Sequence, residues 1–233
     1  MNFKIGGFQK LSLLDFPGKV AAIVFTNGCN FRCPFCHNFE LVENGLSDFT
    51  TDEIIDYLVK RKNLIDGVTI TGGEPTIQVD LEDFIKEIKE KTNLLIKLDT
   101  NGTNPQKLEK LLDEDLIDYV AMDIKNDFDN YSKVIGLYNY DNSKIKESIK
   151  IIKEKAKEYE FRTTIIKDYH SIENIKNIIK YIGKDSNYYL QKFIVSDNVP
   201  DKKLSTYTDD ELKEMVEKLS KNYPKIKLRG IKN

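Results

Sequence analysis

The sequence predicts an α/β fold: an open, partial barrel of parallel strand–helix units, (β/α)6, in a single domain over residues 1–233. Apolar, strand-like runs alternate with segments of helical periodicity along the chain. Polar residues follow successive predicted strands at their carboxyl ends, where barrel enzymes carry their active-site loops. Six such units are too few for a closed eight-stranded barrel, and no linker or repeat divides the chain. A flat, doubly wound sheet is the alternative architecture.

The predicted strands and helices alternate from residue 20 onward. Strands are expected at 20–27, 67–71, 94–98, 118–124, 161–166 and 188–195, with a possible last strand at 226–231. Helices are expected to begin near Thr51, Leu81, Asn104, Ile145, Ile172 and Thr208. The first strand is a continuous apolar run between two glycines, which is typical of a strand buried on both faces. In the helices, apolar residues recur three and four positions apart, and Asn104-Pro105 and Thr208–Glu211 supply capping signals.

The composition indicates an ordinary solvated surface. The chain has 233 residues, a formal net charge of −2 and a pI near 5.9, so the basic patch that nucleic-acid binding needs is not expected. No run approaches the roughly eighteen apolar residues of a membrane span. The N-terminus lacks the charged-then-apolar pattern of a secretory signal. We therefore expect a cytoplasmic protein with neither nucleic acid nor membrane as a partner.

All three cysteines of the chain, Cys29, Cys33 and Cys36, lie within eight positions. An odd, clustered set in a chain that is not secreted favours reduced thiols and metal ligation over disulfides. Three thiolates can bind three irons of a [4Fe–4S] cluster, which normally has four, so one iron would be open to a non-protein ligand. Structural zinc with three cysteines and His37 or His170 is the alternative. It is less favoured, because His37 directly follows Cys36 and is poorly placed to complete a tetrahedron.

Polar residues also follow the next three predicted strands: Gly72-Gly73-Glu74, then Asp99-Thr100, then Asp123 and Lys125. Parallel strands end on one face, so these residues are expected to converge with the cysteines. The glycines would let a ligand approach the backbone closely, and Glu74 would offer a carboxylate to an ammonium group. The alternative for each is a simple turn or cap residue.

Two further polar residues lie in or near the fifth strand. Arg162 alternates with Thr164, so both side chains should lie on one face of the strand. A charge on an inner face is costly unless it is paired, which favours Arg162 as a partner of a carboxylate. His170 follows the strand end and is expected to be a solvated loop residue.

The loop Cys29–Cys36, with the aromatic Phe35 before its last cysteine, and Gly72–Pro75 together resemble the radical S-adenosylmethionine (SAM) superfamily. Further segments resemble its glycyl-radical-enzyme activating branch, and within that branch the activating proteins of anaerobic ribonucleoside-triphosphate reductase: Leu13–Lys19, Cys36–Asn38, Asp99–Gly102 and Asp123–Lys125. The resemblance covers nearly the whole chain and implies the partial barrel of the radical SAM type.

The resemblance implies one cluster, ligated by the three cysteines as catalytic ligands, whose open iron is chelated by SAM. One electron, supplied by a flavodoxin or ferredoxin, would cleave SAM to methionine and a 5′-deoxyadenosyl radical, which abstracts hydrogen from a glycine of a partner glycyl-radical enzyme. Two alternatives stay open. One is a superfamily member acting on a small molecule, as 7-carboxy-7-deazaguanine synthases do, and the other is a zinc-stabilised module without catalysis.

The resemblance also implies roles for single residues. The implied SAM contacts are Phe35, Cys36 and His37 along the adenine, Gly72, Gly73 and Glu74 at the methionine ammonium, and Asp123, Ile124, Lys125 and Arg162 at the ribose and carboxylate. A monovalent cation is implied at Asp99, Thr100 and Asp123. Where several relatives have a histidine this chain has Phe193, so no contact is implied there. With no other cysteine in the chain, no further cluster is expected.

Overall fold

The computed structural model describes residues 2–43 and 48–231. Within these residues, eight strands form one sheet whose spatial order follows the chain. The strands are β1 (Ile5–Ser12), β2 (Ala21–Thr26), β3 (Gly67–Gly72), β4 (Leu95–Thr100), β5 (Tyr119–Asp123), β6 (Glu158–Ile165), β7 (Tyr188–Lys192) and β8 (Ile226–Arg229). Strands β2 to β8 pair in parallel, and β1 runs antiparallel to β2.

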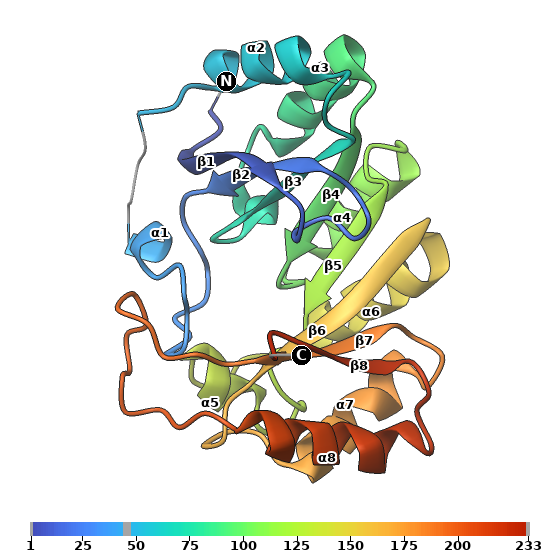
Figure 1. The fold of residues 1–233 in the computed structure, drawn as a ribbon. Coiled ribbons are helices and arrows are strands. Elements are labelled where there is room, and N and C mark those ends of the chain that lie inside the picture. The colour runs from blue at the N-terminus through green and yellow to red at the C-terminus, as the bar shows by residue number, and fades with distance from the viewer. Residues whose placement is uncertain (1, 44–47, 232–233) are drawn as a thin grey trace.

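The order of the strands decides between the two predicted architectures. A doubly wound sheet reverses its strand order at a switch point, whereas here every strand pairs with its neighbour in sequence. In the described part of the chain β1 and β8 do not pair with each other, so the sheet stays open (Figure 1). The prediction of an open, partial parallel barrel is therefore confirmed.

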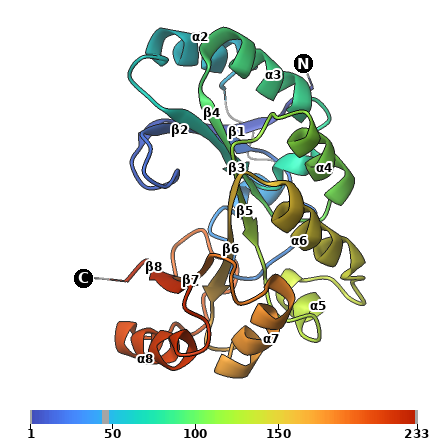
Figure 2. The same ribbon diagram turned by 90° about the vertical axis from the view of Figure 1, so that its right-hand side faces the viewer.

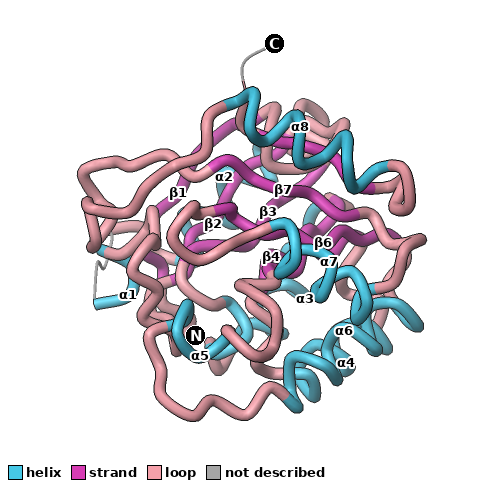
Figure 3. Tube along the Cα trace, turned by 90° about the horizontal axis from the view of Figure 1, so that it is seen from below, coloured by secondary structure: helices cyan, strands magenta, loops and turns pink. Residues whose placement is uncertain are grey.

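The helices lie on the outer side of the curved sheet (Figures 2 and 3). They are α1 (Glu40–Glu43), α2 (Thr51–Arg61), α3 (Leu81–Thr92), α4 (Pro105–Asp113), α5 (Tyr131–Ile135), α6 (Ser143–Lys155), α7 (Ile172–Ile182) and α8 (Asp209–Ser220), with a 3-10 turn η1 at Pro75–Ile77. The capping signals act as predicted: the Asn104 side chain accepts from the Lys107 N–H, and Thr208 forms a capping box with Glu211. None of the described helices is long and apolar enough to cross a membrane.

The two faces of the sheet differ in polarity. The apolar residues predicted for α3, Leu81, Phe84, Ile85 and Ile88, are fully buried in the core that the helices form with the sheet. On the inner face a small apolar cluster of Phe16, Ala21, Tyr119 and Ala121 fills one end. Toward the carboxyl ends of the strands the inner side chains become polar, and this end forms the site.

Three elements differ from the sequence prediction. Strand β1 was not predicted, because its glycines and exposed positions hide the alternation of a strand, and its pairing with β2 is interrupted by register shifts. The short helices α1 and α5 were not predicted either, since four and five residues are too few to show a helical period. All three lie beside the cysteine loop or its strand.

Candidate active site

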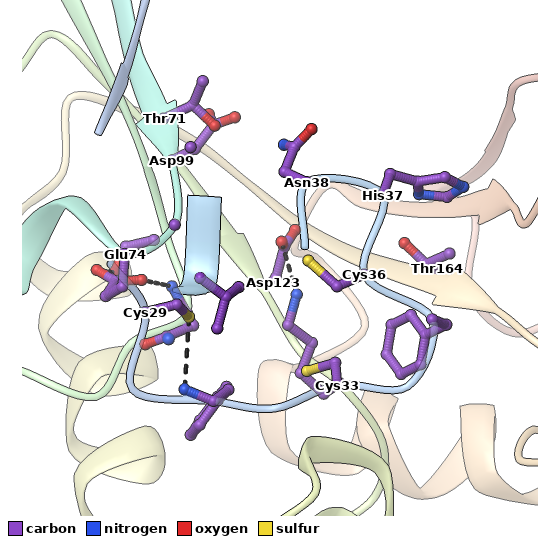
Figure 4. Close-up of a pocket in the computed structure, with 18 of the residues that line it drawn as sticks. Cys29, Cys33, Cys36, His37, Asn38, Thr71, Glu74, Asp99, Asp123 and Thr164 are labelled. Atoms are coloured by element: carbon purple, nitrogen blue, oxygen red, sulfur yellow. Dashed lines mark hydrogen bonds and ion pairs between the residues drawn. The ribbon is translucent and has the colours of Figure 1, made fainter. Parts of the chain in front are cut away.

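A cavity of about 250 Å³ lies at the carboxyl ends of the strands, where the sequence places the site. It is lined by the three cysteines and by predicted residues from each of the following three strands, and Figure 4 shows the loop curving past Glu74, Asp99 and Asp123. The predicted residues in its lining are Cys29, Cys33, Phe35, Cys36, His37, Gly72, Gly73, Glu74, Asp99, Thr100, Asp123, Lys125 and Arg162. The convergence predicted from parallel strand ends is therefore observed. Ile124 is the exception: its side chain is buried outside the cavity, and its carbonyl accepts from the Thr163 hydroxyl.

The cysteine loop is held from below by α5 and from the side by the loop after β4. The Arg32 N–H donates to the Ile135 carbonyl at 2.9 Å, and the buried ring of Phe31 packs edge-on against Tyr131. Asn30 donates to the Thr103 hydroxyl at 2.7 Å and accepts from the Asn101 amide at 2.9 Å. These contacts fix the loop by its own backbone and its non-cysteine side chains, which leaves the thiols free to act as ligands.

Gly72, the last residue of β3, and Gly73 line the cavity, and on their other side there is no space for a side chain. A β-carbon at Gly73 would lie 1.9 Å from the carbonyl oxygen of Gly28, and one at Gly72 would lie 2.4 Å from the Thr26 nitrogen. Gly72 also has a positive φ of 111°. The space beside both glycines is filled by the start of the cysteine loop and the end of β2, so they serve to bring the two loops together.

Glu74 is a buried brace that also lines the cavity. Its carboxylate accepts from the Thr76 N–H (3.0 Å) and hydroxyl (2.6 Å), the Thr100 hydroxyl (2.8 Å) and the Asn101 N–H (2.6 Å). Three of these donors meet at Oε1, whereas Oε2 accepts only from Asn101, so Oε2 keeps a lone-pair position. Burial raises the pKa of Glu74, although these donors oppose the effect. The side chain ties the end of β3 to the end of β4.

A chain of alternating charges crosses the floor of the cavity. Arg162 donates through Nε to Asp123 at 2.8 Å and through Nη1 to Asp99 at 3.2 Å, so its predicted pairing with carboxylates is confirmed. Lys125 donates to the second oxygen of Asp123 at 2.9 Å, and Lys97 donates to the second oxygen of Asp99. Burial would raise the pKa of Asp123, but Arg162 and Lys125 outweigh it and hold that pKa well below its usual range.

This arrangement corrects the prediction of a monovalent cation at Asp99, Thr100 and Asp123. Each of the four carboxylate oxygens already faces a cationic side chain. The Thr100 hydroxyl donates to Glu74 and accepts from the Gly102 N–H at 3.0 Å. The residues present therefore do not fit the ion. Lys97 was missed in the sequence analysis. Like Arg162, it is a charged residue in an apolar strand, and it alternates with Asp99, so both side chains lie on one face of that strand.

The thiols lie in a buried environment with one cation close by. Burial raises the pKa of Cys29 to about 11 and that of Cys33 to about 12, while Lys125 opposes the effect at both. At neutral pH the free thiols are therefore protonated, and they become ligands only when a metal displaces the proton.

The donor set fits an iron–sulfur cluster better than a zinc ion. Among the described residues no group of three or more His, Cys, Asp or Glu side chains is placed to hold one metal ion. The His37 Nε2 donates to the Ile194 carbonyl (2.8 Å), and His170 is engaged elsewhere, so neither completes a tetrahedron with the cysteines. In a cluster each thiolate binds a different iron, and the three sulfurs need not converge on one point.

Aromatic side chains form one wall beside the last cysteine. Phe193 is fully buried, with its ring centroid 6.5 Å from that of Phe35 and 5.5 Å from that of His37. Phe193, which stands where several relatives have a histidine, thus supports the cysteine loop by packing against Phe35 and His37. His37 itself is exposed.

The prediction that His170 is a solvated loop residue is wrong. Only 2% of its surface is exposed. Its Nδ1 accepts from the Ile166 N–H at 3.1 Å, and its Nε2 lies 2.8 Å from the Lys125 carbonyl, which requires the neutral tautomer with the proton on Nε2. His170 therefore holds the backbone of Lys125, a residue that lines the cavity.

Comparisons with known proteins agree with this site. The model of the radical SAM superfamily matches residues 23–182. A Methanocaldococcus jannaschii protein provisionally named a glycyl-radical enzyme activating enzyme is 34% identical over 232 residues, covering 96% of this chain and 94% of that protein. The pyruvate formate-lyase-activating enzyme of Clostridium pasteurianum is 28% identical over 242 residues, covering 92% and 98%. A radical SAM methyltransferase from Sphaerobacter thermophilus superposes with a TM-score of 0.72 at 16% identity, covering 94% of this chain and 68% of that one, and shows the fold alone.

Radical SAM enzymes use a [4Fe–4S] cluster and SAM, so the prediction of these two cofactors is confirmed. The family match covers more than half of the chain, and the archaeal relative aligns along nearly all of it. The protein is therefore an enzyme of this class. The chain belongs to the radical SAM superfamily, in its branch of glycyl-radical-enzyme activating enzymes.

Proposed function

We propose that this enzyme activates a glycyl-radical enzyme, with anaerobic ribonucleotide reductase as the first candidate partner. The observation that carries the proposal is the loop of three thiols without a fourth, beside a cavity with a cationic floor. When bound, the cluster and SAM supply a 5′-deoxyadenosyl radical, the species that takes a hydrogen atom from a glycine. Every other task falls to the residues of this chain.

Cys29, Cys33 and Cys36 are the proposed cluster ligands. Lys125 favours their thiolate forms, because its ammonium lowers the pKa of Cys29 and Cys33 against the effect of burial. The fully buried contacts of Phe31 below the loop keep water from that side of the thiols.

The SAM contacts are proposed from the cavity lining. Arg162 and Lys125 supply positive charge for the methionine carboxylate, since the floor carries three cations against two anions. The backbone of Gly72-Gly73 and the Oε2 atom of Glu74, which accepts a single hydrogen bond, are the proposed contacts of the ammonium. Phe35 and His37 form the proposed wall along the adenine.

The partner is proposed to approach the open side of the barrel. The segment after β7 exposes Ile194 and Val195, at 57% and 38% of their surface, next to the His37 ring that lines the cavity. A partner's glycine loop can reach the site there without crossing the helices, which lie outside the sheet. A low-potential flavodoxin or ferredoxin is the proposed electron donor.

The test is electron paramagnetic resonance of the anaerobically reconstituted enzyme after reduction, mixed with SAM and purified anaerobic ribonucleotide reductase. We expect about four irons per chain and a glycyl radical on the partner, with 5′-deoxyadenosine formed in step with it. The same mixture with pyruvate formate-lyase tests the partner assignment. If only pyruvate formate-lyase acquires the radical, the partner is the lyase and not the reductase.

Cys33→Ser is the matched negative control, because it should lose iron and 5′-deoxyadenosine together. Formation of 5′-deoxyadenosine without a radical on either protein would favour the small-molecule alternative. One tightly bound zinc ion per chain and no SAM cleavage would support the alternative of a zinc-stabilised module without catalysis.

A further inference from the structure

Lys97 is the most deeply buried charged side chain of the cavity floor. Its side chain is 2% exposed, and its ammonium forms an ion pair with Asp99. It projects from the inner face of β4, two residues after Leu95, which packs on the apolar cluster of Phe16, Ala21, Tyr119 and Ala121. A lysine between an apolar layer and a carboxylate layer needs a charge partner, and Asp99 is that partner.

The ion pair sets the position of a cavity residue. Asp99 uses one oxygen for Lys97 and the other for Nη1 of Arg162 at 3.2 Å. Along the floor, Lys97, Arg162 and Lys125 alternate with Asp99 and Asp123, three positive charges against two negative ones. Without the Lys97 charge, two carboxylates would share two cations, and Asp99 would be held by Arg162 alone.

The layer around Lys97 also offers oxygen atoms. Thr69 of β3 pairs in register with Lys97, and it lies on the face of β3 that carries the cavity residue Thr71. The Thr69 hydroxyl is buried and has no hydrogen-bond partner among the described residues. The strand beside Lys97 therefore carries a buried oxygen atom without a hydrogen-bond partner.

We propose that Lys97 is a built-in cation that replaces a diffusible monovalent ion at this site, so the enzyme binds SAM without sodium or potassium. Lys97 acts as a positioning residue: it neutralises Asp99, which in turn orients Arg162. Removing the Lys97 charge while keeping its aliphatic chain should open a site for a free ion at the Asp99 carboxylate, with the unpartnered Thr69 hydroxyl on the neighbouring strand. Oxygen atoms of this kind suit hard cations.

The experiment compares Lys97→Met with the wild-type holoenzyme, purified anaerobically. SAM affinity is measured by calorimetry in potassium, sodium or tetramethylammonium chloride at one ionic strength, about 0.15 M, so that screening is equal. Wild-type affinity should be the same in all three salts. Lys97→Met should bind SAM about tenfold or more weakly in tetramethylammonium chloride and recover in potassium or sodium chloride.

The second measurement needs neither SAM nor activity. The thermal unfolding midpoint of Lys97→Met should rise with potassium or sodium relative to tetramethylammonium, and that of the wild type should not. Lys89→Met is the matched control, because it removes a lysine from an ion pair with Asp118 (3.0 Å) away from the cavity, and it should show no ion specificity. Lys97→Met combined with Asp99→Asn removes both charges, and it should lose the response to the ion.

Two results would overturn the proposal. One is a wild-type enzyme that needs potassium or sodium for SAM binding, and the other is a Lys97→Met variant that responds to neither ion in either measurement. If Lys97→Met does not fold, Lys97→Gln is measured in its place under the same criteria. The proposal uses SAM binding, which the proposed function also needs, but it does not depend on which molecule loses hydrogen. A failure to activate any partner would therefore leave it standing.

Discussion

Gly73 lies against Gly28 so closely that a β-carbon at residue 73 would be 1.9 Å from the Gly28 carbonyl oxygen. The next N–H, that of Glu74, donates to the same oxygen at 2.9 Å. The end of β3 and the start of the cysteine loop thus meet backbone to backbone. Any side chain at residue 73 must push the loop away, because the atom it meets belongs to the main chain.

Gly73→Ala is expected to displace the cysteine loop and lower iron content. Overpacking of this kind costs about 1–3 kcal/mol of folding free energy, and here part of the cost should appear as loop movement. The measurement is iron per chain and the thermal unfolding midpoint after anaerobic reconstitution. Gly7→Ala is the control, because its nearest contact, a side-chain atom of Phe25, is at an ordinary 3.6 Å. Equal iron in both variants would contradict the interpretation.

Glu74→Gln is expected to destabilise the fold by about 2 kcal/mol while the cluster is kept. The carboxylate accepts four hydrogen bonds and donates none, so an amide nitrogen would face one donor at the Oε2 position or three at the Oε1 position. Glu214→Gln, on the exposed face of α8, should change stability by less than about 0.5 kcal/mol. Denaturant unfolding of the anaerobic holoproteins measures both. A Glu74→Gln variant as stable as Glu214→Gln would show that the brace is unimportant.

Arg162→Lys is expected to weaken SAM binding by about tenfold or more, because a single ammonium cannot bridge Asp99 and Asp123 as the guanidinium does. The control is Arg229→Lys. Arg229 also makes a forked pair, with Glu160 at 2.7 and 2.9 Å, but it does not line the cavity. Calorimetric titration with SAM should therefore separate the two variants. Similar losses in both would point to a general effect on the barrel.

The stability of the protein should fall below about pH 6.5 in part through His170. Burial lowers the pKa of His170 in the folded state, although its hydrogen bonds to the backbone of Lys125 and Ile166 and the nearby Asp127 oppose this. The unfolded chain then takes up the proton more readily. The stabilisation is fully present above the unfolded pKa and is lost as pH falls through the lower folded value.

His170→Gln should remove this component, because glutamine does not titrate. The difference in unfolding free energy between the wild type and His170→Gln is compared at about pH 5.5 and about pH 7.5, so that effects of the carboxylates common to both proteins cancel. The wild-type advantage should shrink at the lower pH. An advantage that grows on acidification would mean that the folded protein holds His170 charged.

Much of the fold could be predicted from the sequence because the parallel strands and the longer helices each repeat a local pattern. The apolar run before Cys29 and the helical spacing of Leu81, Phe84, Ile85 and Ile88 are visible without any tertiary information. Strand β1 was hidden for a physical reason: its partner and its irregular register are set by β2, not by its own residues.

The sequence predicted which residues belong to the site better than it predicted what those residues contact. The cysteines, Arg162 and the strand-end carboxylates could be named, since each is a chemical exception to an apolar strand or a clustered ligand set. The hydrogen bond from Asn101 to Glu74 and the ion pair of Lys97 with Asp99 depend on which strands lie side by side. The burial of His170 likewise depends on packing that its loop position does not encode.

The order of residues in the chain bears on how the site is made in the cell. The cysteine loop is translated before β4, β5 and β6, whose side chains form the charged floor. Until those strands have left the ribosome, the thiols lack both the burial that raises their pKa and the Lys125 charge that opposes it. We expect iron delivery to act on a nearly finished polypeptide, and a nascent chain to hold its three thiols as unprotected nucleophiles.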